Sequence, residues 1–409
     1  MKISQRAKRI EPFYVMEVAK AAAEMARTLA GTDRPMIFLN IGEPDFTAPP
    51  LVQAAAIKAI ANGATQYTQA TGLPSLREKI SGWYASRFNV DVPPSRIVLT
   101  AGASAALQLA CLALIEAGDE ILMPDPSYPC NRHFVSAADG KAVLLPTTAA
   151  ERFQLTLTKV ADAWTAKTRG VLLASPSNPT GTSIAPQELQ AIAEFVASRG
   201  GITMVDEIYL GLSYDAQYGQ TALALPGRDD KTPHGLGQNI ISINSFSKYF
   251  NMTGWRLGWL VVPEALVSVI ERLAQNLFIC PSTIAQHAAL ACFEPESLAE
   301  YERRRSEFKA RGDYFIPELN RLGLVVPVIP DGAFYAYADC SKLVQKWSNQ
   351  GAVTGSWDVA FELMKRAHLA VTPGRDFGVA APEQFLRFST ASSMPQLREA
   401  IARLEHALQ

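Results

Sequence analysis

Short apolar runs alternate with longer amphipathic stretches through the middle of the chain, between residues 51 and 294. Seven of these runs are rich in Val, Ile and Leu and are too short for helices, so each predicts a buried strand. Strands and helices in alternation are typical of an α/β domain, in which helices cover both faces of a mostly parallel central sheet. The predicted strands are "RIVLT" (96–100), "EILMP" (120–124), "AVLLP" (142–146), "GVLLAS" (170–175), "ITMVDE" (202–207), "NIISIN" (239–244) and "LGWLVVP" (257–263).

The pattern changes after residue 294. The stretch "LAEYERRRSEFKARGDYFIPELNRLGL" (298–324) predicts one long charged helix, and a weaker mixture of strands and helices follows it. We expect a large α/β domain over residues 46–297 and a smaller α+β domain over residues 298–409. Residues 1–45 are predicted to pack against the smaller domain. Because no Pro/Gly-rich linker separates the two domains, the long helix is expected to connect them.

Composition narrows the function. The chain has 409 residues, 48% of them hydrophobic, and its 38 basic and 39 acidic side chains nearly cancel, so neither nucleic acid nor an anionic membrane is an expected partner. Five scattered cysteines without a C-x-x-C spacing argue against disulfides and a structural zinc. The N-terminus lacks the apolar core of a signal peptide, and no apolar run reaches the ~18 residues of a membrane span. We therefore expect a cytoplasmic protein with no metal site.

The stretch "SINSFSKYFNMTGWRLGW" (242–259) gathers candidate chemistry in one turn. Ser245, Ser247 and Lys248 lie where a predicted strand ends, a common place for ligands in α/β proteins. The two hydroxyls and Arg256 would suit a phosphate, because a guanidinium matches phosphate oxygens as a planar fork. Lys248 has three open interpretations: another phosphate ligand, a nucleophile that forms a Schiff base with a carbonyl, or a solvated loop lysine.

A second candidate lies at Gly102, Ala103 and Ser104, where a predicted strand passes into a helix. The free N–H groups at the beginning of a helix bind anions, although a start built of small residues also serves tight packing. Neither GxGxxG nor GxxxxGK[ST] is present, so the sequence predicts no dinucleotide fingerprint and no Walker loop.

Two further segments contribute polar groups. Asn178 in "SPSNPTGT" (175–182) either aims its amide at a ligand or belongs to a plain loop. Asp206 ends an apolar strand, where a carboxylate is costly to bury unless it is paired, and Tyr209 follows it; a structural cap is the alternative. A ligand with a phosphate, a carbonyl, a protonated ring nitrogen and a phenolic oxygen would engage all these groups. Pyridoxal 5'-phosphate has all four.

The chain resembles the class I/II pyridoxal-phosphate aminotransferases of fold type I, and among them the gamma-type, aspartate-aminotransferase-like subgroup. The resemblance extends over nearly the whole chain through ordered motifs. They are "NIGEPDF" (40–46), "YTQATGLPSLRE" (67–78), "PDPSYP" (124–129), "SNPTG", "VDEIY", "SFSKYFNMTGWRLGW", "GAFYAY" (332–337) and "LRFSTA" (386–391).

The resemblance implies a role for each residue around the cofactor ring. Lys248 would be the Schiff-base lysine, and Tyr128 would stack on the ring. Asp206 would pair with the pyridine nitrogen, while Asn178 and Tyr209 would hold the ring oxygen. The phosphate would engage Ala103, Ser104, Ser245, Ser247 and Arg256.

The resemblance also implies a homodimer with active sites at the subunit interface, because Tyr67 would reach the phosphate in the neighbouring subunit. Arg387 would clamp the substrate α-carboxylate, helped by Asn178 and the Gly42 backbone. Taken singly, Tyr67 and Tyr128 read as core aromatics and Arg387 as a surface charge. One departure concerns the helix beginning at Gly102: many relatives carry a lysine or another polar residue where this chain has Ser104 and Ala105.

The predicted function is that of a transaminase of amino acid metabolism, which moves an α-amino group from an L-amino acid to a 2-oxo acid, here 2-oxoglutarate. Apolar and aromatic residues near the expected pocket favour a broad range of neutral and aromatic donors. An aspartate-preferring enzyme, with Arg375 or Arg132 as the second cation, is one alternative. The others are a carbon-sulfur β-lyase and a non-enzymatic pyridoxal-phosphate sensor. The pocket residues are Phe13, Tyr14, Ile41, Phe46 and Tyr335.

Overall fold

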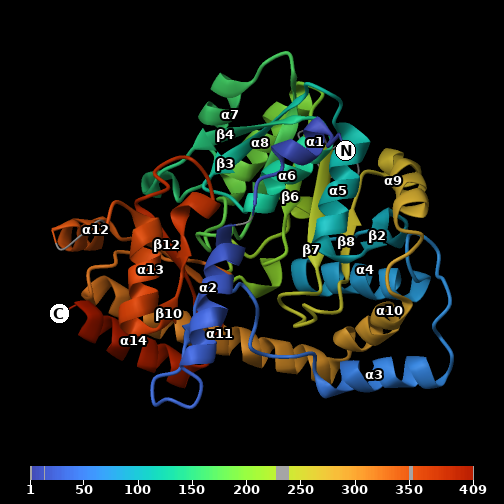
Figure 1. The fold of residues 1–409 in the computed structure, drawn as a ribbon. Coiled ribbons are helices and arrows are strands. Elements are labelled where there is room, and N and C mark those ends of the chain that lie inside the picture. The colour runs from blue at the N-terminus through green and yellow to red at the C-terminus, as the bar shows by residue number, and fades with distance from the viewer. Residues whose placement is uncertain (1, 13, 227–238, 350–352, 409) are drawn as a thin grey trace.

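The computed structural model describes residues 2–12, 14–226, 239–349 and 353–408. A large twisted sheet with helices on both faces occupies one side of the molecule, and a smaller group of helices and short strands occupies the other (Figure 1).

The large sheet has seven strands in the order β2-β8-β7-β6-β5-β3-β4. Six strands run parallel to one another, and β8 alone is antiparallel to both of its neighbours. All seven predicted strands are confirmed, with ends that shift by one or two residues. They are β2 (Ile97–Thr100), β3 (Glu120–Asp125), β4 (Lys141–Pro146), β5 (Thr168–Ala174), β6 (Ile202–Asp206), β7 (Ile240–Ser245) and β8 (Gly258–Val261).

Successive side chains of these strands enter different cores, as the two-residue period of a strand requires. Met204 packs in the core under helices α5, α6 and α9, whereas its neighbour Val205 packs in the core under α7 and α8. A third, aromatic core lies under α3, α4 and α10. These helices are α3 (Pro50–Ala61), α4 (Pro74–Phe88), α5 (Gly102–Leu114), α6 (Pro129–Ala137), α7 (Leu157–Ala163), α8 (Pro186–Ser198), α9 (Glu264–Leu277) and α10 (Thr283–Leu290).

The chain ends build the second group. Strand β1 of the N-terminal segment pairs in parallel with β10, and β11, β12 and β9 form a separate antiparallel sheet. The domain boundaries stay a prediction. The elements are α1 (Gln5–Arg9), α2 (Tyr14–Thr28), β1 (Ile37–Phe38), β9 (Tyr335–Asp339), α12 (Ser341–Ser348), α13 (Ser356–Ala367), β10 (Leu369–Ala370), β11 (Thr372–Pro373), β12 (Phe385–Ser389) and α14 (Met394–Leu408).

Helix α11 (Pro295–Arg321) is the predicted long helix, and it runs beneath both groups of elements (Figure 1). Its residues Tyr301 and Phe308 pack in the aromatic core of the large sheet, while Phe315 and Leu319 pack among the C-terminal elements. The helix therefore ties the two groups together along its whole length. Within the described residues, no helix has the length and apolar character needed to span a bilayer.

Candidate active site

The direction of the strands brings the candidate residues to one edge of the large sheet. Thr100, Asp206 and Ser245 are the last residues of three strands that run the same way, so they lie at the same edge. Because β8 runs the other way, its first residue, Gly258, lies at this edge and pairs with Ser245. Arg256, two residues before Gly258, is therefore placed beside the turn that follows Ser245.

Aromatic packing orients that turn. Phe246, Tyr249 and Phe250 are buried in the aromatic core, with Phe246 and Phe250 ring centroids 5.0 Å apart. This anchoring leaves the intervening Ser247 and Lys248 side chains to face the opposite way, toward the sheet edge. The Ser247 backbone N–H donates to Ser245 Oγ over 3.0 Å, which tightens the turn.

Two glycines permit close approach of the helix α5 start to Arg256. Gly102 has φ +79°, and a Cβ there would lie 2.6 Å from Arg256 Nη2. A Cβ on Gly258 would lie 2.8 Å from the Ala103 nitrogen. Both contacts are shorter than a side chain tolerates, so glycine at both positions lets the guanidinium sit against the positive end of the helix, as an anion site requires.

The predicted residues around the ring, the phosphate and the substrate carboxylate meet in one cavity of about 570 Å³. Tyr67 is the exception among them. The lining comes from the ends of strands of the large sheet, from helix α2, from the segment before α3 and from strands β9 and β12. The predicted residues in the lining are Gly42, Ala103, Ser104, Tyr128, Asn178, Asp206, Tyr209, Ser245, Ser247, Lys248, Arg256 and Arg387.

Arg387 is a buried cation at the second side of this cavity, with 5% of its surface exposed. It lies in the middle of β12, and its Nη1 donates to Asn178 Oδ1 over 2.9 Å. Its Nη2 donates to the Asn40 carbonyl over 2.6 Å. Its Nε is buried without a hydrogen-bond partner among the described residues. A guanidinium held in this way has the donors and the charge to bind a carboxylate.

Asp206 and Lys248 have shifted pKa values for the same physical reason. Burial raises the pKa of Asp206 to about 7 and lowers the pKa of Lys248 to about 8, an effect to which the positive charges of Arg387 and Arg256 add. Lys248 Nζ donates to the Gly42 carbonyl over 2.5 Å. A cationic ring nitrogen beside Asp206 would offset the cost of burying the carboxylate.

Tyr209 and Tyr335 form a pair of buried phenols whose oxygens lie 2.5 Å apart. Burial raises the pKa of both, and each remains a neutral donor. Tyr335 also lies under Arg387, whose Cζ is 4.6 Å from the ring centroid. A Cβ on Gly42 would collide with the Tyr335 hydroxyl, so only glycine fits beside this pair.

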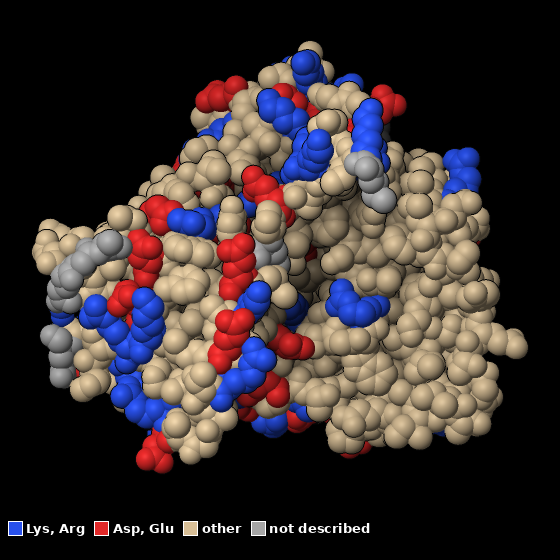
Figure 2. Space-filling view, viewed as in Figure 1, with Lys and Arg blue, Asp and Glu red and all other residues tan. Residues whose placement is uncertain are grey.

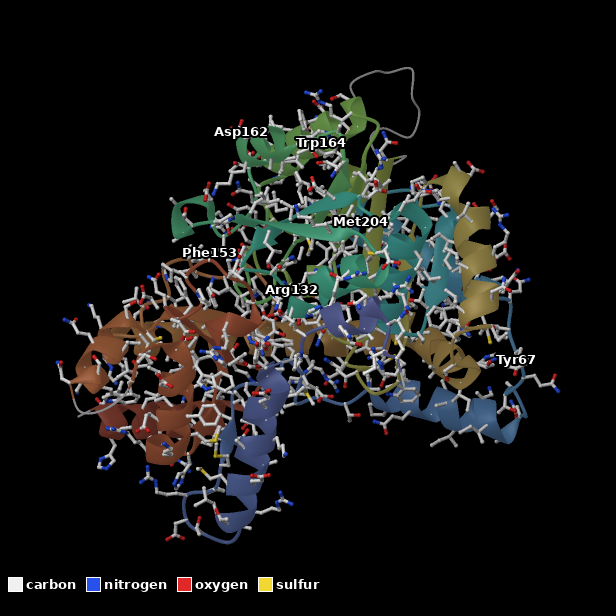
Figure 3. The ribbon with its side chains drawn as sticks, turned by 45° about the horizontal axis from the view of Figure 1, so that its top comes forward. Tyr67, Arg132, Phe153, Asp162, Trp164 and Met204 are labelled. Carbon is white, nitrogen blue, oxygen red and sulfur yellow. The ribbon has the colours of Figure 1, made fainter. Side chains whose placement is uncertain are left out.

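Some of the predicted residues lie elsewhere. Tyr67 is 83% exposed and points away from the molecule (Figure 3). Of the five residues expected near the pocket, Ile41 and Tyr335 line the cavity. For Tyr14 and Phe46 the prediction is wrong, because Tyr14 lines a neighbouring cleft and Phe46 packs on α11. Phe13 lies outside the described residues.

Arg132 and Arg375, the proposed second cations, line that neighbouring cleft and not the cavity. Arg375 forms an ion pair with Glu383 over 2.9 Å. The Nη2 atom of Arg132 lies 3.8 Å from Oε2 of Glu11. Each guanidinium therefore already has a carboxylate close by.

Sequence reasoning missed one wall of the cavity, which is formed by Val15, Met16 and Ala19 of helix α2. Periodicity predicts a helix from such a stretch, but it does not show which distant cavity the helix covers. Asn40 and Leu107 are further lining residues that were missed. Asn40 is the first residue of the motif "NIGEPDF", and Leu107 lies one helical turn after Ser104, so the nearby motif residues were the available signal.

The donor set fits pyridoxal 5'-phosphate. Hydroxyl groups, helix N–H groups and Arg256 lie together at one end of the cavity, where they suit a phosphate. The amine of Lys248 lies in the same cavity, and the buried carboxylate of Asp206 would be stabilised by a cationic ring nitrogen. The fold and this site together define a pyridoxal-phosphate-dependent enzyme of fold type I. The chain belongs to the aminotransferase class I and II family, whose model matches residues 34–404.

Individual relatives agree with this assignment. The chain is 37% identical to a valine–pyruvate aminotransferase of Mycobacterium tuberculosis, over 97% of this chain and 96% of the relative. It is 33% identical to a probable aspartate/prephenate aminotransferase of Aquifex aeolicus, over 100% and 98% of the two chains. A crystal structure of an aspartate aminotransferase from Rhizobium meliloti superposes with a TM-score of 0.90 at 30% identity, covering 100% of this chain and 99% of the other. These names place the chain among transaminases with differing substrates.

The lowered pKa of Lys248 predicts how the cofactor-free protein takes up pyridoxal phosphate. Only the neutral amine attacks a carbonyl, so the rate of uptake should rise with pH and reach half its maximum near pH 8. In an Arg387→Gln variant this midpoint should move to higher pH, because a positive charge that disfavours the ammonium form is removed. Stopped-flow absorbance across pH 6 to 11 measures both. A midpoint that stays in place in the variant contradicts the assigned electrostatics.

Proposed function

We propose that this protein is a transaminase for neutral L-amino acids that carries its cofactor on Lys248 through a Schiff base. The observation that carries the proposal is the buried Arg387, which faces the same cavity as the amine of Lys248. A carboxylate held by the guanidinium would place an amino acid's Cα near the lysine, as proximity catalysis needs.

The residues divide the work as follows. Bound pyridoxal phosphate supplies an electron sink for the bonding pair released at Cα. Arg387 and Asn178 would hold the α-carboxylate, and the Lys248 amine would act as the base that takes the proton from Cα and, once protonated, as the acid that gives it back. Asp206 would pair with the ring nitrogen and favour its protonated form, Tyr128 would pack on the ring face, and Tyr209 and Asn178 would donate hydrogen bonds to the ring oxygen.

The lining supports a neutral donor side chain. Beyond the cofactor and carboxylate groups, the wall is apolar where α2 contributes Val15, Met16 and Ala19 and where Ile41 lies. The cations in the described lining are Lys248, Arg256 and Arg387, and each has a role that does not involve a substrate side chain. Aspartate would leave its second carboxylate without a partner in this wall, which disfavours it.

The same lining bears on the acceptor. The sequence-based expectation was 2-oxoglutarate, which also carries a second carboxylate. We propose that a monocarboxylate 2-oxo acid such as pyruvate is the better acceptor. The similarity to the valine–pyruvate aminotransferase of Mycobacterium tuberculosis supports this choice.

A donor panel tests the function. With pyruvate as acceptor, kcat/KM for valine, methionine and phenylalanine should exceed that for aspartate by about tenfold or more, because one unpaired carboxylate in an apolar wall costs more than a missing methylene. Loss of the cofactor's absorbance on adding each donor reports the first half-reaction alone. Preference for aspartate contradicts the apolar wall. Release of pyruvate from an S-alkylcysteine, which carries a sulfur leaving group on Cβ, without any 2-oxo acid would identify a β-lyase instead.

Removing the guanidinium tests the carboxylate clamp. Arg387→Ala should weaken transition-state binding of α-amino acids by ~2 to 5 kcal/mol, as loss of one partner from a buried charged pair does. Simple amines that lack the carboxylate should react in the variant much as in the wild type. An equal loss for amines and amino acids would show that Arg387 acts on structure and not on the substrate.

The exposed face around Tyr67 supports a homodimer. Ile57 and Ile60 of α3 are 68% and 57% exposed, and Ile279, beside the start of α10, is 52% exposed. Thr283 Oγ1 donates to the Gln66 carbonyl, which joins these segments. Few charged side chains appear over this part of the surface (Figure 2). We infer that a second copy covers this face and receives Tyr67 in its phosphate site.

Mixed dimers test the shared site. Tyr67→Ala should weaken phosphate binding and activity, and Lys248→Ala should abolish transamination. When the two variants are unfolded, mixed and refolded together, one site of each mixed dimer regains both residues, so activity should rise above the sum of the separate variants. If mixing gives no gain in activity, Tyr67 does not contribute to the active site of the other subunit, and the shared-site proposal is wrong.

A further inference from the structure

Two guanidiniums of helix α11 contact residues 45–47, which directly follow the segment that carries the Asn40 and Gly42 carbonyls. Arg304 and Arg311 are seven residues apart, so they project from the same face of the helix. Both are buried, with 8% and 1% of their surfaces exposed. Neither lines the cavity, and neither belongs to a motif that the reaction uses.

Phe46 lies between these two guanidiniums. The Cζ atoms of Arg304 and Arg311 are 4.9 Å and 5.1 Å from its ring centroid, within the range of a cation–π contact. Arg311 also holds Asp45 in a bidentate pair, with Nη1 to Oδ1 at 2.8 Å and Nη2 to Oδ2 at 2.9 Å. Arg304 Nη1 donates to the Thr47 carbonyl over 2.6 Å. Residues 45–47 are thus fixed to the helix by three kinds of contact.

The same two side chains reach both halves of the active site. Arg311 Nη1 donates to the Ala391 carbonyl over 2.5 Å, just beyond the strand that carries Arg387. Arg304 Nη1 donates to Asn251 Oδ1, and Asn251 Nδ2 donates to the Lys248 carbonyl. The helix therefore connects residues 45–47 with the backbone that carries Lys248 and with the backbone just after the strand that carries Arg387.

We propose that Asp45 and Arg311 are positioning residues for substrate binding. By fixing residues 45 and 46, they hold the Asn40 carbonyl against Arg387 Nη2 and the Gly42 carbonyl against Lys248 Nζ. The Arg387 guanidinium is therefore already oriented for a carboxylate before the substrate binds, so less conformational entropy of the protein is lost on binding. This inference rests on the proposed function, because it concerns binding of an α-carboxylate.

The variants Asp45→Asn and Arg311→Met remove the bidentate pair from either side. Asp45 is the more exposed partner, with 31% of its side chain accessible against 1% for Arg311, so Asp45→Asn is the variant expected to fold normally. Each should raise KM for valine about 10- to 100-fold, as a misplaced binding group does, while kcat falls far less. Cofactor affinity should stay near the wild-type value, since the phosphate groups are untouched.

A second readout does not depend on turnover. The unreactive carboxylate 3-methylbutanoate, titrated into the holoenzyme and followed by cofactor absorbance, should bind more weakly to both variants by the same factor as KM rises. Arg403→Met is the matched control, because Arg403 is also buried and also joins a helix carboxylate, Glu399, to a backbone carbonyl, that of Pro35. It should lower the melting temperature and leave KM and 3-methylbutanoate binding unchanged.

The outcomes separate the two proposals. Folded Asp45→Asn protein with wild-type KM and 3-methylbutanoate affinity overturns the positioning role, as does an equal rise in the Arg403→Met control. Absence of transamination in the wild type, or 3-methylbutanoate binding that survives Arg387→Ala, overturns the proposed function itself.

Discussion

The pairing of Ser245 with Gly258 across two antiparallel strands is the constraint on which the site depends. It sets the end of β7 against the beginning of β8, so the turn with Lys248 and the segment with Arg256 share one edge. The same register brings Gly258 against the start of α5, where a side chain would collide with the Ala103 nitrogen. A slip of one residue would turn each strand side chain to the other face and separate these groups.

The burial of charged side chains is the second constraint on the site, and hydrogen bonds to neighbouring groups offset its free-energy cost. Arg387 has two carbonyl oxygens and one hydroxyl around it, from Asn178, Asn40 and Thr372. Glu207, beside Asp206, is satisfied by Thr221, Ser242 and the Ala222 backbone, although burial raises its pKa to about 7.

Much of the fold follows from local pattern, and the remainder depends on contacts that pattern does not encode. The runs at 120–124 and 202–207 match β3 and β6 because uninterrupted apolar residues demand burial on both faces. The reversal of β8 has no such signal, since an apolar run reads the same in either direction. Motif residues such as Asn178 and Arg387 meet as expected, because the resemblance encodes spatial neighbours. The place of Phe46 depends on α11, more than 250 residues away, and no local pattern predicts it.

Helix α2 lines the cavity without taking part in the groups that would hold the cofactor. It contributes three apolar side chains to the cavity and none of the polar groups assigned to the cofactor. It is also lightly buried: only Val18 and Ala22 of its fifteen residues are fully enclosed. Exchange at Val15, Met16 and Ala19 would therefore cost little stability, because surface positions tolerate substitution. Under the proposed function, the range of amino donors could change through these three positions while the residues assigned to the cofactor stay the same. A library of variants at Val15, Met16 and Ala19 is therefore a direct way to engineer a new donor range.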